Sequence, residues 1–432
     1  MKAFIGMLLL LFFFSNAWGE EVLTLKDCEE IALKRFPSLR AAEAQRKAAE
    51  RHLQAVSRQR LPRLYGAYAF RFYRDPERIT TPFGSYPIRD REEGSLAFTV
   101  RLPVFHGLAI PTKTALARLG VKLAEVEESR LRQELLLKVR EAFFQLIEAE
   151  KRRVLAQKSW ARIRAHLADV EGFFEEGLVA RNQVLHTRAE LREAEHRLVK
   201  AENAFVVAQA ALNLLLVRPL EAPLKIKPVF PGQEVKQDWK ALVSLALKHR
   251  PEVKAARLAL SSQEKELRLV RSRYFPWLDL EAQYYVRGDS PLLSQNPYMD
   301  RENAWIGLRI NWEIWDWGVR GQEAASIRAK ITAAEETLRQ TCDQISFEVR
   351  KAYADLVSAR KRLEAAQEAV SYARENFRLE RARFREGLAD TTDVLDAETL
   401  LTKALTQEIA AKADYEIARA RLAYAVGVDE IF

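Results

Sequence analysis

The sequence repeats itself, and this constrains the fold more than any other feature. Residues 32–64 and 246–278 share 11 identical residues in 33 positions, and residues 174–185 and 384–395 share six in twelve. Unrelated chains of this composition would share about two or three of the first 33. Pro37 and Gly177 are among the recurring residues, which argues against chance similarity of helices rich in Ala and Leu. We predict two internal structural repeats, residues 20–218 and 239–432, joined by a proline-rich linker at 219–238.

Each copy contains one long segment without Gly or Pro. Residues 322–386 lack both, and their apolar positions recur every three or four residues with one irregularity at Cys342. This spacing is typical of a coiled coil, and 65 helical residues would extend about 98 Å. Residues 121–171 form the matching segment of the first copy. We expect Cys342, which falls on the apolar seam, to be buried.

Shorter helical segments flank each long helix. Residues 26–60 and 182–217 total 71 in the first copy, and residues 239–274 and 392–426 total 71 in the second. Each long helix can therefore lie beside two half-length helices stacked end to end. Gly177 and Gly387 separate the long helix from the returning half helix, and we expect both to be turn residues with positive φ at one tip of the molecule.

Two β-hairpins, 63–105 and 277–315, are predicted between half helix and long helix. Their segments 64–72, 95–102, 278–286 and 305–314 alternate apolar and polar residues, apart from Trp305. Strands of roughly ten residues cross a bilayer when tilted. Four Trp residues gather near one end, as in an interfacial girdle: Trp277, Trp312, Trp315 and Trp317. The alternative is four soluble strands packed on a core.

Four membrane strands would require association with other chains. The smallest membrane barrels have eight strands, and an open sheet edge cannot remain unpaired in lipid. Two chains would give eight strands around a filled interior, whereas three would give twelve, which can enclose water.

The N-terminal residues 1–19 are predicted to be a signal peptide. Lys2 precedes an apolar run, residues 5–14, and residues 17–19 have the small-x-small form of a cleavage site. An uncleaved anchor is the alternative, disfavoured because the run is shorter than a membrane span. No later stretch reaches 18 apolar residues, so we expect no transmembrane helix and any membrane passage by strands.

Composition disfavours enzymes and nucleic-acid binders. The two Cys and six scattered His residues form no metal-ligand spacing, and the common nucleotide-binding and hydrolase motifs are absent. We therefore expect no cofactor, no metal and no catalytic residues. The net charge of +9 arises from 69 basic and 60 acidic residues interleaved along helices, which indicates solvated helix faces and no nucleic-acid partner.

Several segments resemble the TolC-like outer membrane efflux family across essentially the whole mature chain. They are residues 33–37 (LKRFP), 102–105 (LPVF), 312–318 (WEIWDWG), 176–180 (EGLVA) and 386–396 (EGLADTTDVLD). The resemblance implies a mainly α protein with a transmembrane β portion. A long antiparallel coiled-coil duct would enter the periplasm, and four strands per chain would contribute to a shared 12-stranded trimeric β-barrel in the outer membrane.

The function implied by the resemblance is a passive trimeric exit duct of a tripartite efflux or type I secretion system. A periplasmic adaptor and an inner-membrane transporter are the implied partners, together with outer-membrane lipid. The alternative function is a secreted periplasmic coiled-coil scaffold without a pore, which would not need four strands of bilayer length.

The resemblance also assigns residues at the tips. Asp393 and Asp396 match an acidic pair that rings the constriction, although an acidic residue in a first helical turn can instead cap the helix, with Thr391 or Thr392 as N-cap. The expected adaptor-docking residues are Gly177, Leu178, Val179, Ala180, Gly387 and Leu388.

The contacts that hold the gate of the family's archetype closed are not reproduced in this sequence. Phe384 and Ala389 stand at the positions of its gating Tyr and Arg, and His166 and Gln183 at the polar positions near the first tip. We therefore expect the closed tip to be held by different contacts.

Overall fold

The computed structural model describes residues 22–89, 91–227, 238–294 and 300–429. The predicted signal peptide and most of the predicted linker lie outside these ranges. The chain divides into two compact units. Unit 1 comprises Met1–Arg40, Leu131–Ala246 and Ser346–Phe432, and unit 2 comprises Ala41–Arg130 and Leu247–Ile345.

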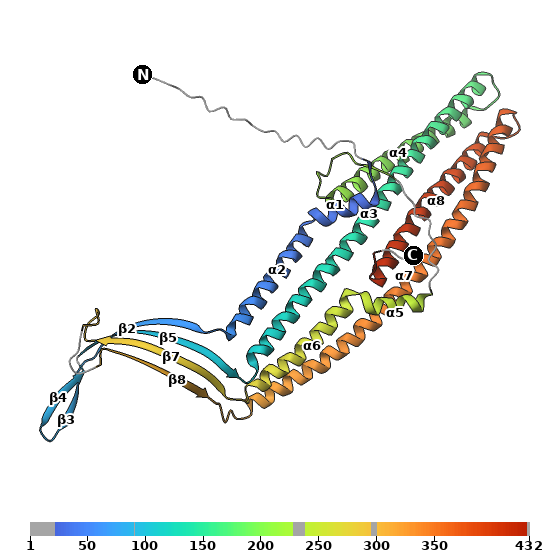
Figure 1. Ribbon diagram of the computed structural model, residues 1–432. Helices are drawn as coiled ribbons and strands as arrows, with labels where there is room; N and C mark the ends of the chain where they lie inside the picture. The colour runs from blue at the N-terminus through green and yellow to red at the C-terminus, as the bar shows by residue number, and fades with distance from the viewer. Residues whose placement is uncertain (1–21, 90, 228–237, 295–299, 430–432) are drawn as a thin grey trace, which may run out of the picture. The chain divides into compact units, whose positions relative to one another are not determined.

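Two long helices run through both units. Helices α3 (Ala109–Glu175) and α7 (Val319–Arg385) each contain 67 residues. In unit 1, α4 (Arg181–Leu215) and α8 (Thr391–Val426) turn back beside them (Figure 1). Val370 and Ala373 of α7 pack against Leu401 and Ala404 of α8. Ala373 and Ala404 are small, which allows the two helices to approach closely.

The half helices that precede the hairpins are interrupted, which corrects the predicted continuous segments 26–60 and 239–274. Helix α1 (Leu25–Arg35) stops before α2 (Pro37–Ser57) and the 3₁₀ turn Arg58–Arg60, and α5 (Trp239–His249) stops before α6 (Pro251–Ser272). The residues before the two prolines are extended, with ψ of 125° at Phe36 and 127° at Arg250. Proline disfavours a helical residue before it and lacks the N–H of a helix interior.

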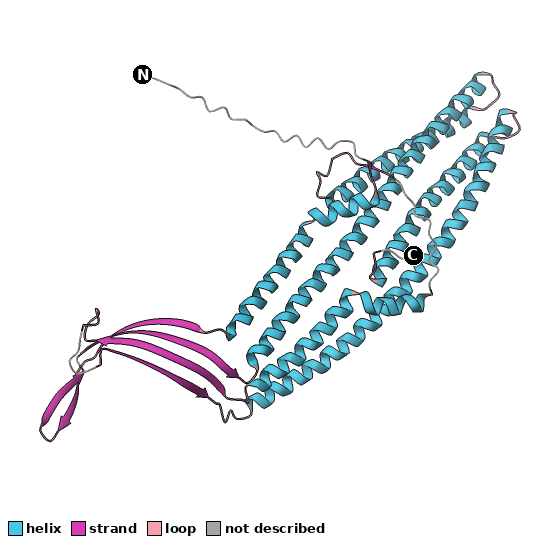
Figure 2. Ribbon diagram, viewed as in Figure 1, coloured by secondary structure: helices cyan, strands magenta, loops and turns pink. Residues whose placement is uncertain are grey.

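Unit 2 contains one antiparallel sheet of four strands in the order β2-β5-β7-β8 (Figure 2). The strands are β2 (Arg63–Phe72), β5 (Glu92–His106), β7 (Trp277–Gly288) and β8 (Glu302–Asn311). A small hairpin, β3 (Glu77–Thr81) and β4 (Gly84–Arg89), lies within the first connection. The second predicted hairpin ended at residue 315, whereas β8 ends at Asn311.

The strand register separates the sheet into an apolar and a polar face. Leu64 lies opposite Val100, and Leu280 lies opposite both Leu102 and Leu308. The apolar face is uncovered within the chain: Ile306 is 72% and Leu308 66% exposed.

Trp305 belongs to the polar face, which explains its break in the alternation. Its indole N–H donates to Gln283 at 3.1 Å, and Gln283 donates to Thr99 at 3.0 Å. Trp277 also departs from the predicted girdle, because its ring stacks on His106. Trp312, Trp315 and Trp317 remain exposed.

A further hydrophobic core in unit 1 joins residues of α1, α3, α4 and α8. The two-residue strands β1 (Val22–Leu23) and β6 (Lys225–Ile226) pair in parallel beside it. Cys28 is fully buried in this core, and burial raises the pKa of its thiol to about 12. Cys342, which was expected to be buried, is only half-buried, and neither Cys28 nor Cys342 forms a disulfide among the described residues.

Helix α4 departs from the expectation of no membrane-length helix. Among the described residues it is the one helix with the length and composition to cross a bilayer. Val184, Ala194 and Leu212 of this helix are buried, whereas Val199, Val206 and Val207 are exposed. Length and composition alone are weak evidence for a membrane helix.

Candidate functional site at the helical tips

Both tips use the same backbone turn. Gly177 and Gly387 have φ of 76° and 73°, which confirms the predicted positive φ. The amide of Leu178 donates to the carbonyl of Phe173 at 2.8 Å, and that of Leu388 donates to Arg383 at 2.8 Å. With the matching bonds from both glycine amides, this is the Schellman pattern that ends a helix.

The expected docking residues occupy different environments. Leu178 and Leu388 are 68% and 65% exposed at the ends of the turns. Gly177, Ala180 and Gly387 are also exposed, whereas Val179 packs partly inward. That inward cluster joins all four helices through buried Val170, Val184, Phe384 and Val394. The two tips therefore expose the apolar side chains of Leu178 and Leu388 to solvent, while their inward-facing residues form one small shared core.

Asp393 and Asp396 are both exposed, and the buried Val394 and Leu395 lie between them. Asp390 is the N-cap of α8, and the carboxylate of Asp393 accepts its amide N–H at 3.0 Å. The structure thus assigns a capping role to Asp393, with Asp390, not Thr391 or Thr392, at the cap position.

Two contacts connect the first tip with the second. The rings of His166 and Phe384 lie edge to face with centroids 4.9 Å apart. The hydroxyl of Thr391 donates to the side-chain oxygen of Gln183 at 3.1 Å. These contacts use three positions at which the sequence differs from the archetype, His166, Phe384 and Gln183. How the tips close a passage stays a prediction.

A buried ion pair lies one turn further along α8. Glu398 is 3% exposed and accepts two hydrogen bonds from Arg162 of α3, each 2.7 Å long. The hydroxyls of Ser159 and Thr402 donate to the same carboxylate at 2.9 and 3.0 Å. A buried carboxylate with this many donors is fully compensated, so the pair fixes α3 against α8.

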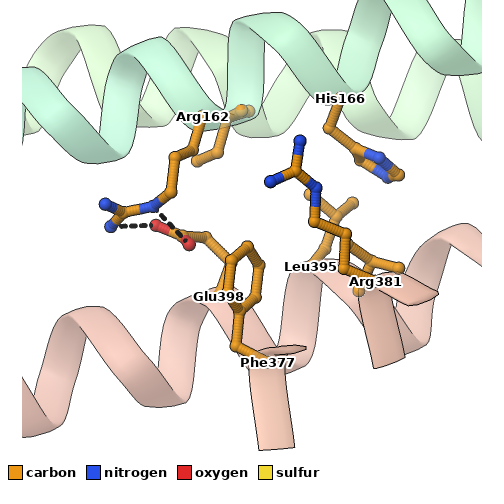
Figure 3. Close-up of a pocket in the computed structure, with 8 residues that line it drawn as sticks. Arg162, His166, Phe377, Arg381, Leu395 and Glu398 are labelled. Carbon is orange, nitrogen blue, oxygen red and sulfur yellow. Dashed lines mark hydrogen bonds and ion pairs between the residues drawn. The ribbon is translucent and has the colours of Figure 1, made fainter. Parts of the chain in front are cut away.

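Next to this pair is a cavity of about 20 Å³ (Figure 3). Its polar lining comes from Arg162, His166, Arg381 and Glu398, and Arg381 of α7 points into the same space as His166. His166 is 8% exposed, and its Nε2 atom has no hydrogen-bond partner within the described part of the chain. The space suffices for about one water molecule, so it is too small for cargo.

Burial lowers the pKa of His166, and the nearby positive charge of Arg381 acts in the same direction. Asp169 and a hydrogen bond with the backbone of Thr391 oppose this shift. His166 is consequently neutral at physiological pH.

Sequence analysis missed Arg162, Arg381 and Glu398. A signal existed for Glu398, because Val394, Leu395 and Leu401 form an apolar stripe that this one acidic residue interrupts. No such signal identified its partner, because Arg162 lies 236 residues away in the chain. Among the described residues no group of three or more His, Cys, Asp or Glu side chains could hold a metal ion.

Comparison with known proteins identifies the class. Residues 30–217 and 242–428 match the family described as Outer membrane efflux protein. The chain is 27% identical to the alkaline protease secretion protein AprF of Pseudomonas aeruginosa over 94% of this chain and 85% of the relative. It is 23% identical to the outer membrane protein TolC of Vibrio cholerae over 70% of each chain.

Solved structures show the same fold. The chain is similar to CusC, with a TM-score of 0.81, 17% identity and coverage of 94% of this chain and 92% of CusC. For VceC of Vibrio cholerae the TM-score is 0.79, with 18% identity and coverage of 94% and 96%.

These matches and the fold define a channel protein. The chain belongs to the outer membrane efflux protein family. It is an exit duct of the bacterial outer membrane whose helices extend into the periplasm.

Proposed function

We propose that three copies of the chain assemble into one duct, with a shared barrel of twelve strands. The observation that carries this proposal is the sheet in unit 2. One of its faces exposes Ile306, Leu308 and other large apolar side chains, and its edge strands β2 and β8 have no neighbour on their outer sides among the described residues. Lipid is the solvent that such a face prefers, and edge pairing with further chains satisfies the open backbone groups.

The two halves of each chain act as structural repeats in this proposal, residues 20–218 and 239–432, with a signal peptide at residues 1–19. The family matches the chain in two separate segments, which supports the repeat. Helices α3 and α7 have equal lengths, and each follows a pair of antiparallel strands. Six half-length copies of the unit would then surround one lumen.

The duct carries out no chemical step and takes its energy from a partner. An inner-membrane transporter and a periplasmic adaptor supply the cargo and the driving force. The similarity to AprF, whose name includes alkaline protease secretion, favours a type I secretion system over efflux of small molecules. A periplasmic scaffold without a pore, the alternative function, gives no role to the exposed apolar sheet.

The exposed tip residues Leu178 and Leu388, with Gly177, Val179, Ala180 and Gly387 around them, form the adaptor-docking surface of this proposal. Asp393 and Asp396 form the constriction, with six carboxylates from three chains. Such a ring favours cations in a narrow passage. The double variant Leu178→Asp, Leu388→Asp should abolish export while the purified duct keeps its oligomeric state and melting temperature. Export that continues unchanged would locate docking elsewhere.

The barrel is tested by charge on each face of β5. Phe98 lies on the apolar face and is 45% exposed, and Thr99 lies on the polar face. Phe98→Arg should destabilise the trimer by about 2–4 kcal/mol if the site lies near the middle of the bilayer, whereas Thr99→Arg should be tolerated. The measurement is trimer yield and melting in liposomes. Equal sensitivity at the two sites, or a soluble periplasmic monomer on fractionation, would rule out the barrel.

A further inference from the structure

The polar face of the sheet has an unequal distribution of charge. Residues that pair across neighbouring strands lie on the same face of the sheet. The strand register therefore identifies which charged residues of the strands lie on the polar face. The arginines are Arg63, Arg71, Arg101, Arg287 and Arg309. The carboxylates are Glu93, Asp279 and Glu281. The arginines outnumber the carboxylates.

Burial of the carboxylates increases the excess of positive charge that solvent reaches on this face. All three carboxylates are buried: Glu93 and Asp279 are 8% exposed and Glu281 is 1% exposed. The side chains of Arg101 and Arg309 are 42% and 52% exposed, although both pair with Glu281. The acidic groups thus lie beneath the layer of guanidinium groups that solvent reaches.

Glu281 explains how the cationic layer is held in place. Its Oε1 accepts from Nε of Arg101, and its Oε2 pairs with Arg309 at 2.7 Å. Arg63 lies directly opposite Arg101 in the register, so two like charges face each other across β2 and β5. Adjacent like charges are unfavourable, and one buried carboxylate between arginines reduces the cost without covering their outer surfaces.

A bulge adds His106 to this face. The register shifts between Pro103 and Phe105, so Phe105 and Leu278 share the apolar face while His106 meets Asp279 at 2.7 Å. Without the extra residue, the alternation of β5 would direct His106 to the apolar face. The bulge gives Asp279 a neutral or cationic partner and leaves no carboxylate of this face exposed.

We propose that the interior of the barrel is a cationic zone that selects for anionic groups, opposite in sign to the acidic pair at the tips. This inference rests on the proposed trimeric barrel, which makes the polar face the lumen. Three chains would place fifteen arginines around one passage, and exposed guanidinium groups bind carboxylates and other oxyanions. Cargo with a net negative charge would then enter the barrel more readily than cationic cargo.

The test is the reversal potential of single channels in planar bilayers under a KCl gradient. The background carries Asp393→Asn and Asp396→Asn, so that the tips do not mask the barrel. We expect this channel to prefer chloride. The further variant R101Q/E281Q/R309Q removes two cations together with their shared carboxylate, so this carboxylate is not left unpaired. It should weaken the preference, because three of the five arginines remain.

Two controls separate charge from structure. R101K/R309K keeps the charge and should keep chloride preference, and Arg192→Gln, an 81% exposed position on α4, should change nothing. Arg63→Gln relieves a like-charge contact and should insert normally, with a smaller shift in the same direction as the triple variant. A chloride preference that is unchanged in both R63Q and the triple variant overturns the inference, and so does a loss in R101K/R309K. A wild-type chain that gives no conductance steps at all would instead refute the proposed pore.

Discussion

The two tips share a turn but differ in how the next helix begins. Helix α4 begins after Ala180, which has no side chain able to cap it, whereas α8 begins after Asp390 with Asp393 bonded back to the cap residue. The residue of α4 that corresponds to Asp393 is Gln183, which accepts from Thr391 of the other tip. In the second tip, Asp393 stabilises the start of its own helix. In the first tip, Gln183 at the equivalent position instead contacts the second tip.

This difference shows how one duplicated turn acquires two roles. The glycine at each tip permits the chain reversal by its own backbone conformation, and it is present in both halves of the chain. Three positions after the N-cap residue, the carboxylate of Asp393 caps α8, whereas the amide of Gln183 makes the contact between the tips. The contact between the tips therefore depends on residues that differ between the halves.

The largest expected effect is at the buried ion pair that ties α3 to α8. Arg162→Ala leaves Glu398 with only hydroxyl donors, and we expect a loss of about 3 kcal/mol, because an uncompensated buried charge is costly. Arg188→Ala is the matched control, since Arg188 pairs with Glu171 within the first tip and is 60% exposed. That change should cost less than about 1 kcal/mol. Thermal and denaturant unfolding in detergent measure the stability of both variants. Equal losses would contradict the larger contribution that we expect from the Arg162–Glu398 pair.

The turn glycines should give equal effects. Gly177→Ala and Gly387→Ala each force an L side chain into positive φ, although neither new methyl group would meet another atom within 4 Å. We expect each substitution to lower the free energy of unfolding by about 1–2 kcal/mol, from backbone strain alone. The same unfolding measurement applies. A clear difference between the two losses of stability would show that tertiary contacts also affect one of the turns.

The caps should give unequal effects. Asp393→Ala removes the acceptor for the Asp390 amide and should cost about 1 kcal/mol, whereas Asp393→Asn retains an acceptor and should cost less. Ala180→Asp should stabilise the first tip by a smaller amount, because it supplies the missing cap. Removal of the acidic pair by Ala thus affects stability as well as charge, and Asn is the variant that isolates cation selectivity. Identical stability of the Ala and Asn variants would exclude the cap.

The smallest expected effect is a pH dependence at His166. Its pKa is lowered by burial, so the unfolded chain binds a proton more readily than the folded one below about pH 6.5. Stability should therefore fall as the pH drops below that value, until the folded state is also protonated. Asp169 and Arg381 are the charged groups that act on His166. In His166→Asn this part of the acid sensitivity should vanish, measured as the difference from wild type between pH 7.5 and 5; an unchanged difference would locate it in other groups.

Local signals accounted for much of the molecule. The heptad-like seams predicted α3 and α7, alternation predicted the strands and their faces, and Gly177 and Gly387 predicted the turns. The prolines at 37 and 251 were also visible, but they were read as parts of continuous helices, although proline disfavours a helical residue before it. The tip contacts were only partly predictable: His166, Gln183 and Phe384 marked the place, but not their partners.

The sequence by itself determined the elements, the turn positions and the separation of polar from apolar faces, because these depend on residues within a few positions of one another. Only the tertiary structure decided that Glu398 meets Arg162, that Gln183 meets Thr391, and that a bulge brings His106 to Asp279. Each of these contacts joins residues 173 or more positions apart. Whether a charge is buried, paired or exposed depends on which distant segment packs against it, and no local pattern carries that information.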